Sequence, residues 1–457
     1  MSTTVMDGAT LYHLLSNGYS NLMQNIELIN ELNVFPVPDG DTGKNMTATL
    51  RGGLETATED ELSVGKMMKS FSRGSLMNAR GNSGIILSQY IRGIAEYTKG
   101  KEKLTPLEFI EALDNGMKRA YTSVSKPTEG TMLTVMREGI HNESSVKESG
   151  DFEQCFQLLT DAFRTSLMNT PNLLPVLRDA GVVDSGGAGL LCVFEGMQSA
   201  LLGEEIDSSS FQEESETMHF HSGDEPAVKV RKISAHTRYA VVAVATGQGI
   251  KDYFLGCGVS VIIEGGQTNN PSTKAFISAF EQLDADYIIV MPNDSNIILT
   301  ANQAAQMYSH ADVRVIPTSS IAEGYSALSM MDLSLDSIEK VVHEMTHYLP
   351  NVTTGYVTTA TRDAKLNGIE IKQGHYIGLT QNCFYSDSTS IVDAAVTLFE
   401  NLPNAQDKQV ITVFCGSAVT DADKEEFYDR ILSRYPLMEI GLLDGNQELY
   451  HMIMAIE

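Results

Sequence analysis

Two aspartates separated by one glycine, Asp39 and Asp41, are the side chains of this sequence best suited to holding a metal ion. Prolines stiffen the chain before them, and Gly40 and Gly43 allow close backbone approaches, so the turn can point both carboxylates the same way. Because Mg²⁺ prefers carboxylate and phosphate oxygens, the segment predicts a site for a magnesium-bound nucleotide, to which Asn33 could add a neutral oxygen. An isolated Asp-Gly-Asp turn is more often a solvated surface turn, so its neighbours decide between the two interpretations.

A second turn carries the small residues Gly81, Asn82, Ser83 and Gly84 directly before a strongly helical stretch. The free N–H groups at a helix N-terminus, together with the helix dipole, favour an anion. The turn therefore predicts a phosphate site, although a glycine-serine turn can also do no more than cap a helix.

Two further turns add polar groups. Thr131 and Met132 follow Gly130, and a longer segment combines a cation, a carboxylate and several glycines. In that segment Arg178 could neutralise phosphate charge, and Asp184 could orient the nucleotide or a basic partner. Each could equally be a structural cap. The residues of interest after Arg178 are Asp184, Gly186 and Gly187.

The elements that must position these turns are helices. From Thr10 to about Leu202, apolar residues recur at helical spacing and are interrupted by short turns that contain glycine or proline. The four turns described above separate these helices, so all four can meet at one end of a helical bundle. Residues 1–202 are expected to form one all-α, nucleotide-binding domain.

The rest of the chain differs in composition and period. Residues 203–234 are rich in serine and acid and predict a linker. After them, apolar β-branched runs alternate with helical stretches, which predicts an α/β region with a mainly parallel sheet at 235–457. Its two halves, 235–350 and 351–457, could be separate lobes.

Two patterns in the α/β region compete with the nucleotide site. Gly247-Gln248-Gly249 follows a predicted strand and is typical of a phosphate-binding turn, although it lacks a full dinucleotide-binding motif. His343-Glu344-Met345-Thr346-His347 fits the zinc-protease pattern HExxH, but no third ligand is evident nearby. We expect a tight structural turn or a carrier-docking edge at the first and an ordinary amphipathic helix at the second.

Composition excludes several classes of protein. The net charge is −27, from 59 acidic and 32 basic residues, and no local basic patch is evident, so nucleic acid is not an expected partner. The five scattered cysteines form no CxxC pair and fit a reduced, cytoplasmic setting. No signal peptide and no run of about 18 apolar residues is present, so membrane insertion is not expected.

The order of the four turns resembles the ADP-binding subunit of dihydroxyacetone kinase, the DhaL domain. In that family the paired aspartates of a D-x-D-x-G-x-N-M stretch bind magnesium, and this chain matches the stretch with Asp39, Asp41, Thr42, Asn45 and Met46. The family's glycine-serine turn matches Gly81–Gly84, its Thr-Met pair near the adenine matches Thr131 and Met132, and its arginine before the closing Asp-Gly turn matches Arg178 before Asp184. A further upstream aspartate of the family has only Asn33 as its counterpart here, at shifted spacing.

The C-terminal half is similar to that of fatty acid kinase catalytic subunits, on the segments 264–273, 292–299 and 315–321. The two resemblances imply a closed barrel of about eight antiparallel helices that binds ATP and Mg²⁺, followed by a region that engages a separate fatty-acid-binding carrier protein. They also imply a homodimer, although the central domain through which family members pair is replaced here by about thirty residues.

The implied function is transfer of the γ-phosphate of ATP to the carboxylate of the carried fatty acid, giving an acyl phosphate. Asp39, Asp41 and Arg178 are the expected catalytic residues. Two alternatives stay open at this point: a kinase for dihydroxyacetone or another small polyol, and a non-catalytic scaffold that binds nucleotide and a carrier.

Overall fold

The computed structural model describes residues 3–34, 39–141, 149–206, 228–230, 236–266, 269–361, 363–366, 368–381, 383–403 and 405–457. Packing contacts divide these residues into two units. The helical unit comprises the described residues of Met1–Glu225 together with Asn270–Lys274, and the α/β unit comprises those of Pro226–Asn269 and Ala275–Glu457. Most of the predicted linker, 203–234, lies outside the described residues, as do residues 35–38 of the acidic turn.

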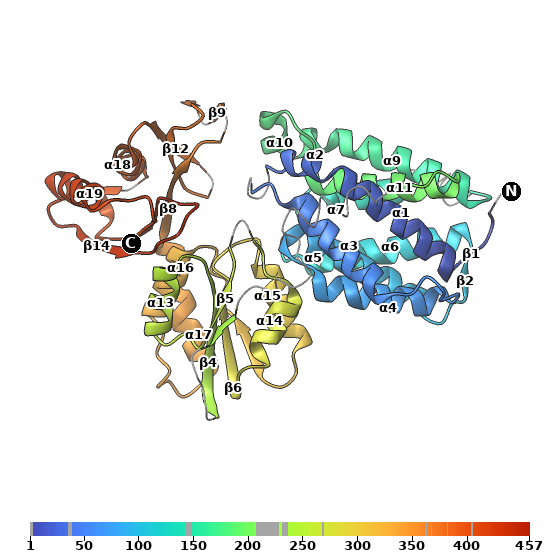
Figure 1. Ribbon diagram of the computed structural model, residues 1–457, viewed down its shortest axis with the longest axis horizontal. Coiled ribbons are helices and arrows are strands. Elements are labelled where there is room, and N and C mark those ends of the chain that lie inside the picture. Colours follow the sequence, from blue (N-terminus) through green and yellow to red (C-terminus); the bar gives the residue numbers. More distant parts are fainter. Residues whose placement is uncertain are drawn as a thin grey trace. The chain divides into compact units, whose positions relative to one another are not determined.

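The helical unit is built almost entirely from helices, as the apolar spacing predicts (Figure 1). One short ladder pairs β1 (Met6–Asp7) with β2 (Lys103–Leu104). The helices are α1 (Gly8–Gln24), α2 (Ile26–Glu31), α3 (Thr42–Thr56), α4 (Val64–Asn78), α5 (Gly81–Thr98), α6 (Pro106–Ser123), α7 (Met132–His141), α9 (Phe152–Leu173), α10 (Pro175–Ala180) and α11 (Ser185–Leu201).

Local sequence signals fix where several of these helices start. Asp7 caps α1 by accepting the N–H of Thr10. At α6, Thr105 and Glu108 form a reciprocal capping box. Each arrangement satisfies N–H groups that the helix itself leaves without acceptors. The polar residues before the apolar runs are therefore the cause of these boundaries.

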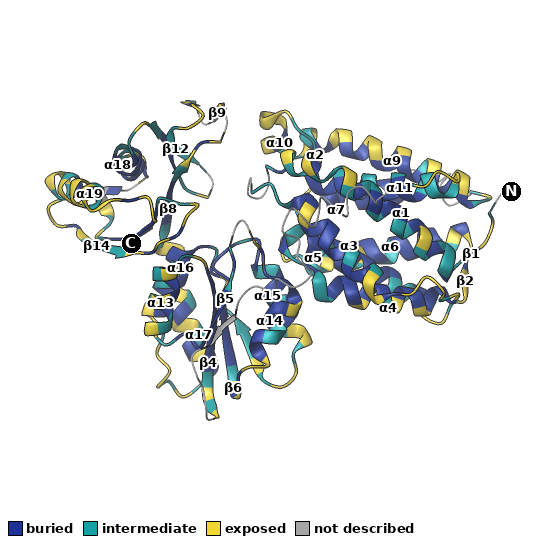
Figure 2. Cartoon of the chain, viewed as in Figure 1, coloured by how far each residue is buried: buried dark blue, intermediate teal, exposed yellow. Residues whose placement is uncertain are grey.

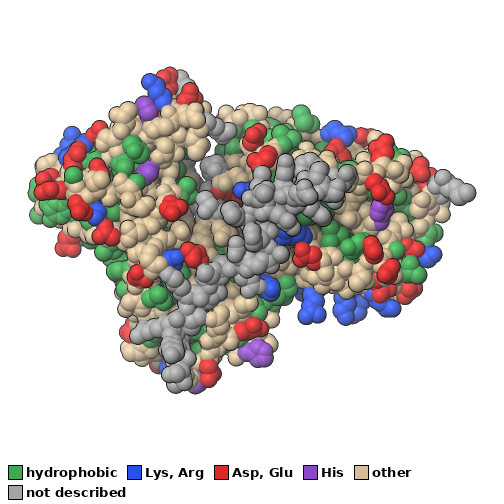
Figure 3. Space-filling model, in the orientation of Figure 1, with side chains coloured by type: hydrophobic (Ala, Val, Ile, Leu, Met, Phe, Trp, Pro, Cys, Tyr) green, Lys and Arg blue, Asp and Glu red, His purple; other side chains and the backbone are tan. Residues whose placement is uncertain are grey.

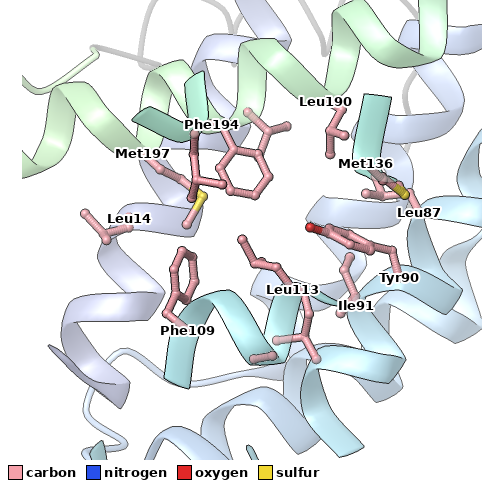
Figure 4. Close-up of a cluster of buried hydrophobic side chains, with 14 of the residues drawn as sticks. Leu14, Leu87, Tyr90, Ile91, Phe109, Leu113, Met136, Leu190, Phe194 and Met197 are labelled. Carbon is pink, nitrogen blue, oxygen red and sulfur yellow. The ribbon is translucent and has the colours of Figure 1, made fainter. Parts of the chain in front are cut away.

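One apolar interior joins the helices of this unit (Figure 4). In packing order α4 lies against α5, α5 against α6, α6 against α7, α7 against α9, α9 against α11, and α11 against α1. Closure into a barrel of eight helices stays a prediction. The inward-pointing side chains in the figure are Leu14, Leu87, Tyr90, Ile91, Phe109, Leu113, Met136, Leu190, Phe194 and Met197.

The first sheet of the α/β unit has the strand order β3-β5-β4-β6-β7. β4 runs parallel to β5 and β6, β6 runs parallel to β7, and β3 is an antiparallel edge strand. This confirms the predicted α/β region with a parallel sheet. The strands are β3 (Val228–Val230), β4 (Thr237–Ala245), β5 (Val261–Glu264), β6 (Ala285–Met291) and β7 (Asp312–Val315), and the helices are α13 (Gln248–Gly256), α14 (Thr273–Phe280), α15 (Ile298–Met307), α16 (Ile321–Ser329) and α17 (Ile338–His347).

The central strand β4 is apolar along both faces because helices cover both. Val241 and Ala243 share a core with Ile250 of α13 and Val341 of α17. The alternate residues of the strand, Val242 among them, pack with helices α14 and α15. Figure 2 shows the inner strands of this sheet as buried along most of their length. A run of β-branched residues without polar alternation is the sequence mark of such a strand.

The second sheet departs from the expectation of a mainly parallel sheet. Its order is β12-β11-β8-β15-β13-β14, and only β13 and β14 pair in parallel among its described strands. The last strand of the chain, β15, lies in the middle of the sheet, between β8 and β13. Sequence periodicity identifies strands but not their order, which is why the expectation was wrong for this sheet.

Helices and a short hairpin complete this second half of the α/β unit. Helix α18 shares a core with β8, β13 and β15, and α19 packs on the same core. The elements are η1 (Leu349–Asn351), β8 (Thr353–Thr359), β9 (Ala364–Leu366), β10 (Ile369–Ile371), β11 (Tyr376–Leu379), β12 (Phe384–Ser388), α18 (Ile391–Asn401), η2 (Ala405–Asp407), β13 (Val410–Cys415), α19 (Asp421–Arg434), β14 (Glu439–Asp444) and β15 (Met452–Ile456).

Acidic side chains are dispersed over the visible face, but α4 carries a basic row (Figure 3). Lys66, Lys69 and Arg73 are exposed on this helix, three and four residues apart. The row is not evident in the sequence because its members are spread over two turns. A duplex-binding protein typically makes about 6–10 phosphate contacts, so three cations do not restore nucleic acid as an expected partner.

The five cysteines are all described and none forms a disulfide, as expected. In the described ranges, none of the helices is both long enough and apolar enough to cross a lipid bilayer.

Two glycines of α13 give a matched test of the packing in the α/β unit. A Cβ on Gly249 would lie 1.6 Å from the Asp444 carbonyl oxygen, whereas a Cβ on Gly256 meets nothing within 4 Å. We expect Gly249→Ala to lower the free energy of unfolding by about 3 kcal/mol or more, because backbone cannot yield as a side chain can. Gly256→Ala should raise it by up to about 1 kcal/mol through helix propensity. Urea unfolding followed by circular dichroism measures both, and equal effects would contradict this account of the contact.

Candidate nucleotide and metal site

Four helices of the helical unit begin close to one another. Thr42 starts α3 and Ser185 starts α11, and their hydroxyl oxygens lie 3.1 Å apart. Ser83, in the first turn of α5, donates a hydrogen bond of 3.5 Å to the Thr42 hydroxyl. Helices α7 and α11 are joined at Asp184, which accepts the N–H groups of Met132 and Gly187. The structure thus brings together the four turns singled out in the sequence, and with them the first turns of four helices, whose N–H groups lack intrahelical acceptors.

The acidic turn leads into α3. Asp41 is the residue before the helix, and its carbonyl oxygen accepts the N–H of Asn45 at 2.9 Å. The Asp39 carboxyl lies within hydrogen-bonding reach of the Asp41 carboxyl. Burial raises the pKa of Asp41, against the lowering effect of hydrogen bonds from Asn45 and its other neighbours. Two carboxyl groups this close share one proton unless a cation lies with them and allows both to be ionised.

Asn33 supports the same turn. Its side-chain Nδ2 donates to Asp39 Oδ1 at 2.6 Å, and the residue is 6% exposed. Its Oδ1 is buried and has no hydrogen-bond partner within the described part of the chain. A buried acceptor left in this state costs about 1–3 kcal/mol, which a bound cation or its hydration water would offset.

The oxygen atoms of this turn fit a hard cation that takes some of its ligands from the protein and the others from a phosphate. The described residues contain no group of three or more His, Cys, Asp or Glu side chains arranged to hold a metal by themselves. Mg²⁺ commonly takes one or two carboxylates and completes its shell with water and substrate oxygens. Asp39, Asp41 and Asn33 supply that kind of partial shell.

Close contact between α3 and α5 explains the glycines of the second turn. Gly81 has a φ of +61°, and a Cβ there would lie 2.3 Å from the Asn45 side-chain nitrogen. A Cβ on Gly84 would lie 2.7 Å from Thr49 Oγ1. Larger residues would separate the two helix starts, so these glycines keep Asn82 and Ser83 beside the acidic turn.

Asp184 is a buried cap shared by two helices. It is 6% exposed, and it accepts the Gly187 N–H at 2.7 Å as well as the N–H groups of Met132 and Gly186. Burial raises the pKa of Asp184 to about 6, although these hydrogen bonds act to lower it. The sequence left open whether Asp184 orients a ligand or caps a helix, and its contacts here are those of a cap.

The glycines beside this cap allow α7 and α11 to approach. A Cβ on Gly186 would lie 3.2 Å from the Met132 Cβ, and one on Gly187 would lie 2.8 Å from the Val135 side chain. Met46 is fully buried against Gly189 of α11. Met132 and Met46 are therefore packing residues at the start of their helices, close to the site but mostly shielded from solvent.

Arg178 is not brought into this cluster. It lies on α10 with a side chain that is 61% exposed, and the ion pair it makes is with Asp179, at 3.5 Å between Nε and Oδ1. Its role in phosphate binding stays a prediction.

The structure adds residues that the sequence patterns did not single out. Asn30 accepts the Gly43 N–H at 2.9 Å, and Ser185 faces Thr42. Asn270 donates to Asp41 from a segment far away in the sequence. Ser185 follows Asp184 directly and could have been suspected, whereas no local signal points to Asn270.

The competing phosphate turn at Gly247–Gly249 is filled by protein. Gly249 and Ile250 both donate their N–H groups to the Gly445 carbonyl oxygen, at 3.0 and 3.2 Å. Two of the N–H groups at the start of α13 therefore already have an acceptor, and the backbone of Gly445 and Gln447 lies against the turn at Gly247. At the HExxH pattern, His343 and His347 are exposed on α17, with ring centroids 5.4 Å apart.

A cavity of about 300 Å³ in the α/β unit is also unsuited to a phosphate. Hydroxyl and amide side chains line it, together with the carboxylate of Glu323, and no cation is among the lining residues. Burial raises the pKa of Glu323, whose Oε2 accepts the N–H and hydroxyl of Ser319. Among the described residues, the start of α3, α5, α7 and α11 is the better candidate for nucleotide.

Two family models match this chain. The one described as the DAK2 domain matches residues 36–199, and the one for the C-terminal region of FakA-like fatty acid kinase proteins matches residues 240–457. The chain is 31% identical to protein YloV of Bacillus subtilis, with 100% of both chains covered. It is 32% identical to an uncharacterized protein of Staphylococcus epidermidis, with 99% of both chains covered.

The alignment with YloV has 557 positions and this chain has 457 residues, so at least 100 positions hold no residue of this chain. Among solved structures, the dihydroxyacetone kinase of C. freundii matches 50% of each chain at 14% identity and a TM-score of 0.37, a likeness too low to carry an argument.

The raised pKa of Asp184 predicts a pH-dependent stability. Its pKa is about 6 in the folded chain against an ordinary value of 3.8, so between these pH values the folded state binds more protons than the unfolded state. Stability contributed through this group therefore falls as the pH rises from about 4 to about 6. The side chain at position 184 cannot titrate in Asp184→Asn, so this variant does not lose stability in this way. The unfolding free energy of the variant minus that of the unsubstituted chain should therefore increase by about 3 kcal/mol from about pH 4 to about pH 6.

Urea unfolding at a series of pH values measures the difference. Asp184→Ala serves as the comparison, because it also loses the titration but leaves the helix starts uncapped, at a further cost of about 1 kcal/mol. Parallel pH profiles for Asp184→Asn and the unsubstituted chain would contradict the assignment.

Proposed function

We propose that this chain, which belongs to the family of fatty acid kinase catalytic subunits and YloV-type proteins, binds Mg-ATP and transfers its γ-phosphate to the carboxylate of a fatty acid held by a separate carrier protein. Family membership rests on the two matched models and on the full-length similarity to YloV. DAK2 and fatty acid kinase domains belong to kinases, and the product of the proposed reaction is an acyl phosphate.

The observation that carries this proposal is the meeting of four helix starts beside two adjacent carboxyl groups. Phosphate oxygens suit N–H groups in the first turns of α3, α5, α7 and α11 other than those that Asp184 and Asn30 already accept. Asp39 and Asp41 suit the cation that accompanies a nucleoside triphosphate, with Asn33 as a neutral ligand. A site for a metal alone would need only the carboxyl groups, and a site for a phosphate alone would need only the helix starts.

The proposed binding roles follow from these positions. Asp39, Asp41 and Asn33 would hold Mg²⁺, which would offset the negative charge of the phosphates. Thr42, Asn82 and Ser83 present polar groups to the phosphates, and Asn45 steadies Asp41. The resemblance to the DhaL domain supports Thr131 and Met132 as the residues near the adenine, where Asp184, Gly186 and Gly187 would fix the backbone. Arg178, on the exposed helix α10, is proposed to reach the phosphates when nucleotide is bound.

Chemistry at this site requires alignment more than proton transfer. A fatty acid carboxylate is ionised near neutral pH, so it can attack the γ-phosphorus without a general base. The barrier is then lowered by holding the reactants in line and by offsetting the negative charge of the phosphates. A polyol acceptor such as dihydroxyacetone has a hydroxyl to deprotonate and would need a base as well.

The α/β unit and the cellular setting complete the proposal. Residues 235–457 are proposed to engage the carrier protein, and the domain boundaries 1–202, 203–234 and 235–457 are retained as part of it. The active form is proposed to be a homodimer. Five unpaired cysteines and a nucleotide co-substrate fit a cytoplasmic protein.

The test is transfer of γ-labelled phosphate from ATP with Mg²⁺, with and without a lipid-loaded carrier, and with dihydroxyacetone in parallel. Asp39→Ala combined with Asp41→Ala should lower transfer by at least about 100-fold, because it removes the proposed metal ligands. Asp60→Ala, at an exposed aspartate after α3, is the matched control and should leave transfer unchanged. Undiminished transfer by the double variant would contradict the proposed site, and transfer to dihydroxyacetone alone would contradict the proposed acceptor.

A further inference from the structure

A short segment that follows β5 in the sequence belongs to the helical unit. Residues Asn270–Lys274 group with that unit, although the residues before and after them group with the α/β unit. The segment is tied to the backbone just before α5, because Thr273 donates its N–H to the Ala79 carbonyl oxygen at 3.1 Å. It therefore lies beside the phosphate turn at Gly81.

Asn270 is the residue of this segment that reaches the acidic turn. It is 3% exposed, and its Nδ2 donates a short hydrogen bond to Asp41 Oδ2. A Cβ on Gly81 would lie 3.2 Å from the same nitrogen, so the absence of a side chain at Gly81 leaves room for the amide. Asn270 thus contacts the proposed metal ligand directly while lying against the start of α5.

The amide of Asn270 repeats the arrangement seen at Asn33. Each asparagine donates from Nδ2 to one aspartate, Asn33 to Asp39 and Asn270 to Asp41. Each also keeps a buried Oδ1 that has no hydrogen-bond partner among the described residues. Two unmatched acceptors beside two adjacent carboxyl groups leave the turn rich in oxygen, the kind of ligand that a hard cation binds.

A purely structural role for Asn270 does not explain why its amide is buried against Asp41 with one oxygen left without a hydrogen-bond partner. The segment is already anchored through Thr273, so the chain does not need the Asn270 side chain to hold it there. Burying an amide with one unmatched oxygen costs about 1–3 kcal/mol, a cost that a structural contact alone leaves unrecovered. A group that orients a metal ligand from behind typically changes metal affinity by about 10–100-fold when removed.

We propose that Asn270 is a positioning residue of the cation site, which holds the Asp41 carboxylate in the orientation that binds the metal. This inference rests on the proposed function, since it presumes that Asp41 is a metal ligand. It adds a residue from beyond the DAK2-matched range, 36–199, to the machinery of that site.

The test measures binding of Mn²⁺ to the full chain in the presence of a non-hydrolysable ATP analogue, from the electron paramagnetic resonance signal of the free ion. Asn270→Ala should weaken Mn²⁺ binding by about 10-fold or more. Asn269→Ala is the matched control, because its side chain is exposed next to Asn270, and it should leave the affinity unchanged. Thermal unfolding of each variant verifies that the protein remains folded at the measuring temperature.

A double-mutant cycle separates positioning from a general loss of structure. If Asn270 acts through Asp41, then Asn270→Ala in an Asp41→Asn background should weaken binding further by less than about 2-fold. Equal losses in the two backgrounds would overturn the proposal, as would an Asn270→Ala variant that binds Mn²⁺ like the unsubstituted chain while Asp41→Asn binds it weakly. Should both single variants bind Mn²⁺ normally, the proposed cation site itself fails, and this inference with it.

Discussion

The buried carboxylate of Asp184 is the interaction on which the site depends most. It accepts N–H groups at the starts of both α7 and α11, and Ser185, the next residue, faces Thr42 at the start of α3. Helix starts leave N–H groups without intrahelical acceptors, so their convergence needs acceptors close by. Asp184 supplies acceptors at the starts of α7 and α11, whereas the Asp41 side chain caps no N–H group at the start of α3. Asp184 thus joins two helix starts, and Asp41 places a second carboxyl group at a third.

The close approach of the helix starts also explains why glycines occur in these turns. Helix starts can meet only if the side chains between them are small, and a Cβ at Gly81, Gly84 or Gly187 would lie within 3 Å of a neighbouring helix. Glycine in these turns is therefore a packing requirement as well as a feature of phosphate-binding loops. This is why the pattern of four turns carries more information than each turn by itself.

Much of this arrangement could be predicted from the sequence, because it is written in local turns. The Asp39–Asp41 turn and the Asp184 cap each precede a helix, and Gly81–Gly84 form the first turn of another. The structure brings all of them together. Relations between distant segments could not be predicted. The Gly247–Gly249 turn resembles a phosphate site until the carbonyl of Gly445 is seen to occupy its donors, and Asn270 reaches Asp41 from 229 residues away. For the same reason the antiparallel second sheet, with the last strand at its centre, was not foreseen.

The proposed function requires that nucleotide phosphates bind at the first turns of α3, α5, α7 and α11. Amide hydrogen exchange of the full chain, with and without Mg²⁺ and a non-hydrolysable ATP analogue, reports on this binding residue by residue, since a phosphate that accepts an N–H slows the exchange of that group. We expect Mg²⁺-dependent protection at Thr42, Lys44, Gly81, Ser83, Leu133 and Ser185. Little change is expected at Met132, Gly186 and Gly187, whose N–H groups Asp184 already accepts, and at the start of α13. Protection confined to the α/β unit, or none in the four first turns, would contradict the proposed site.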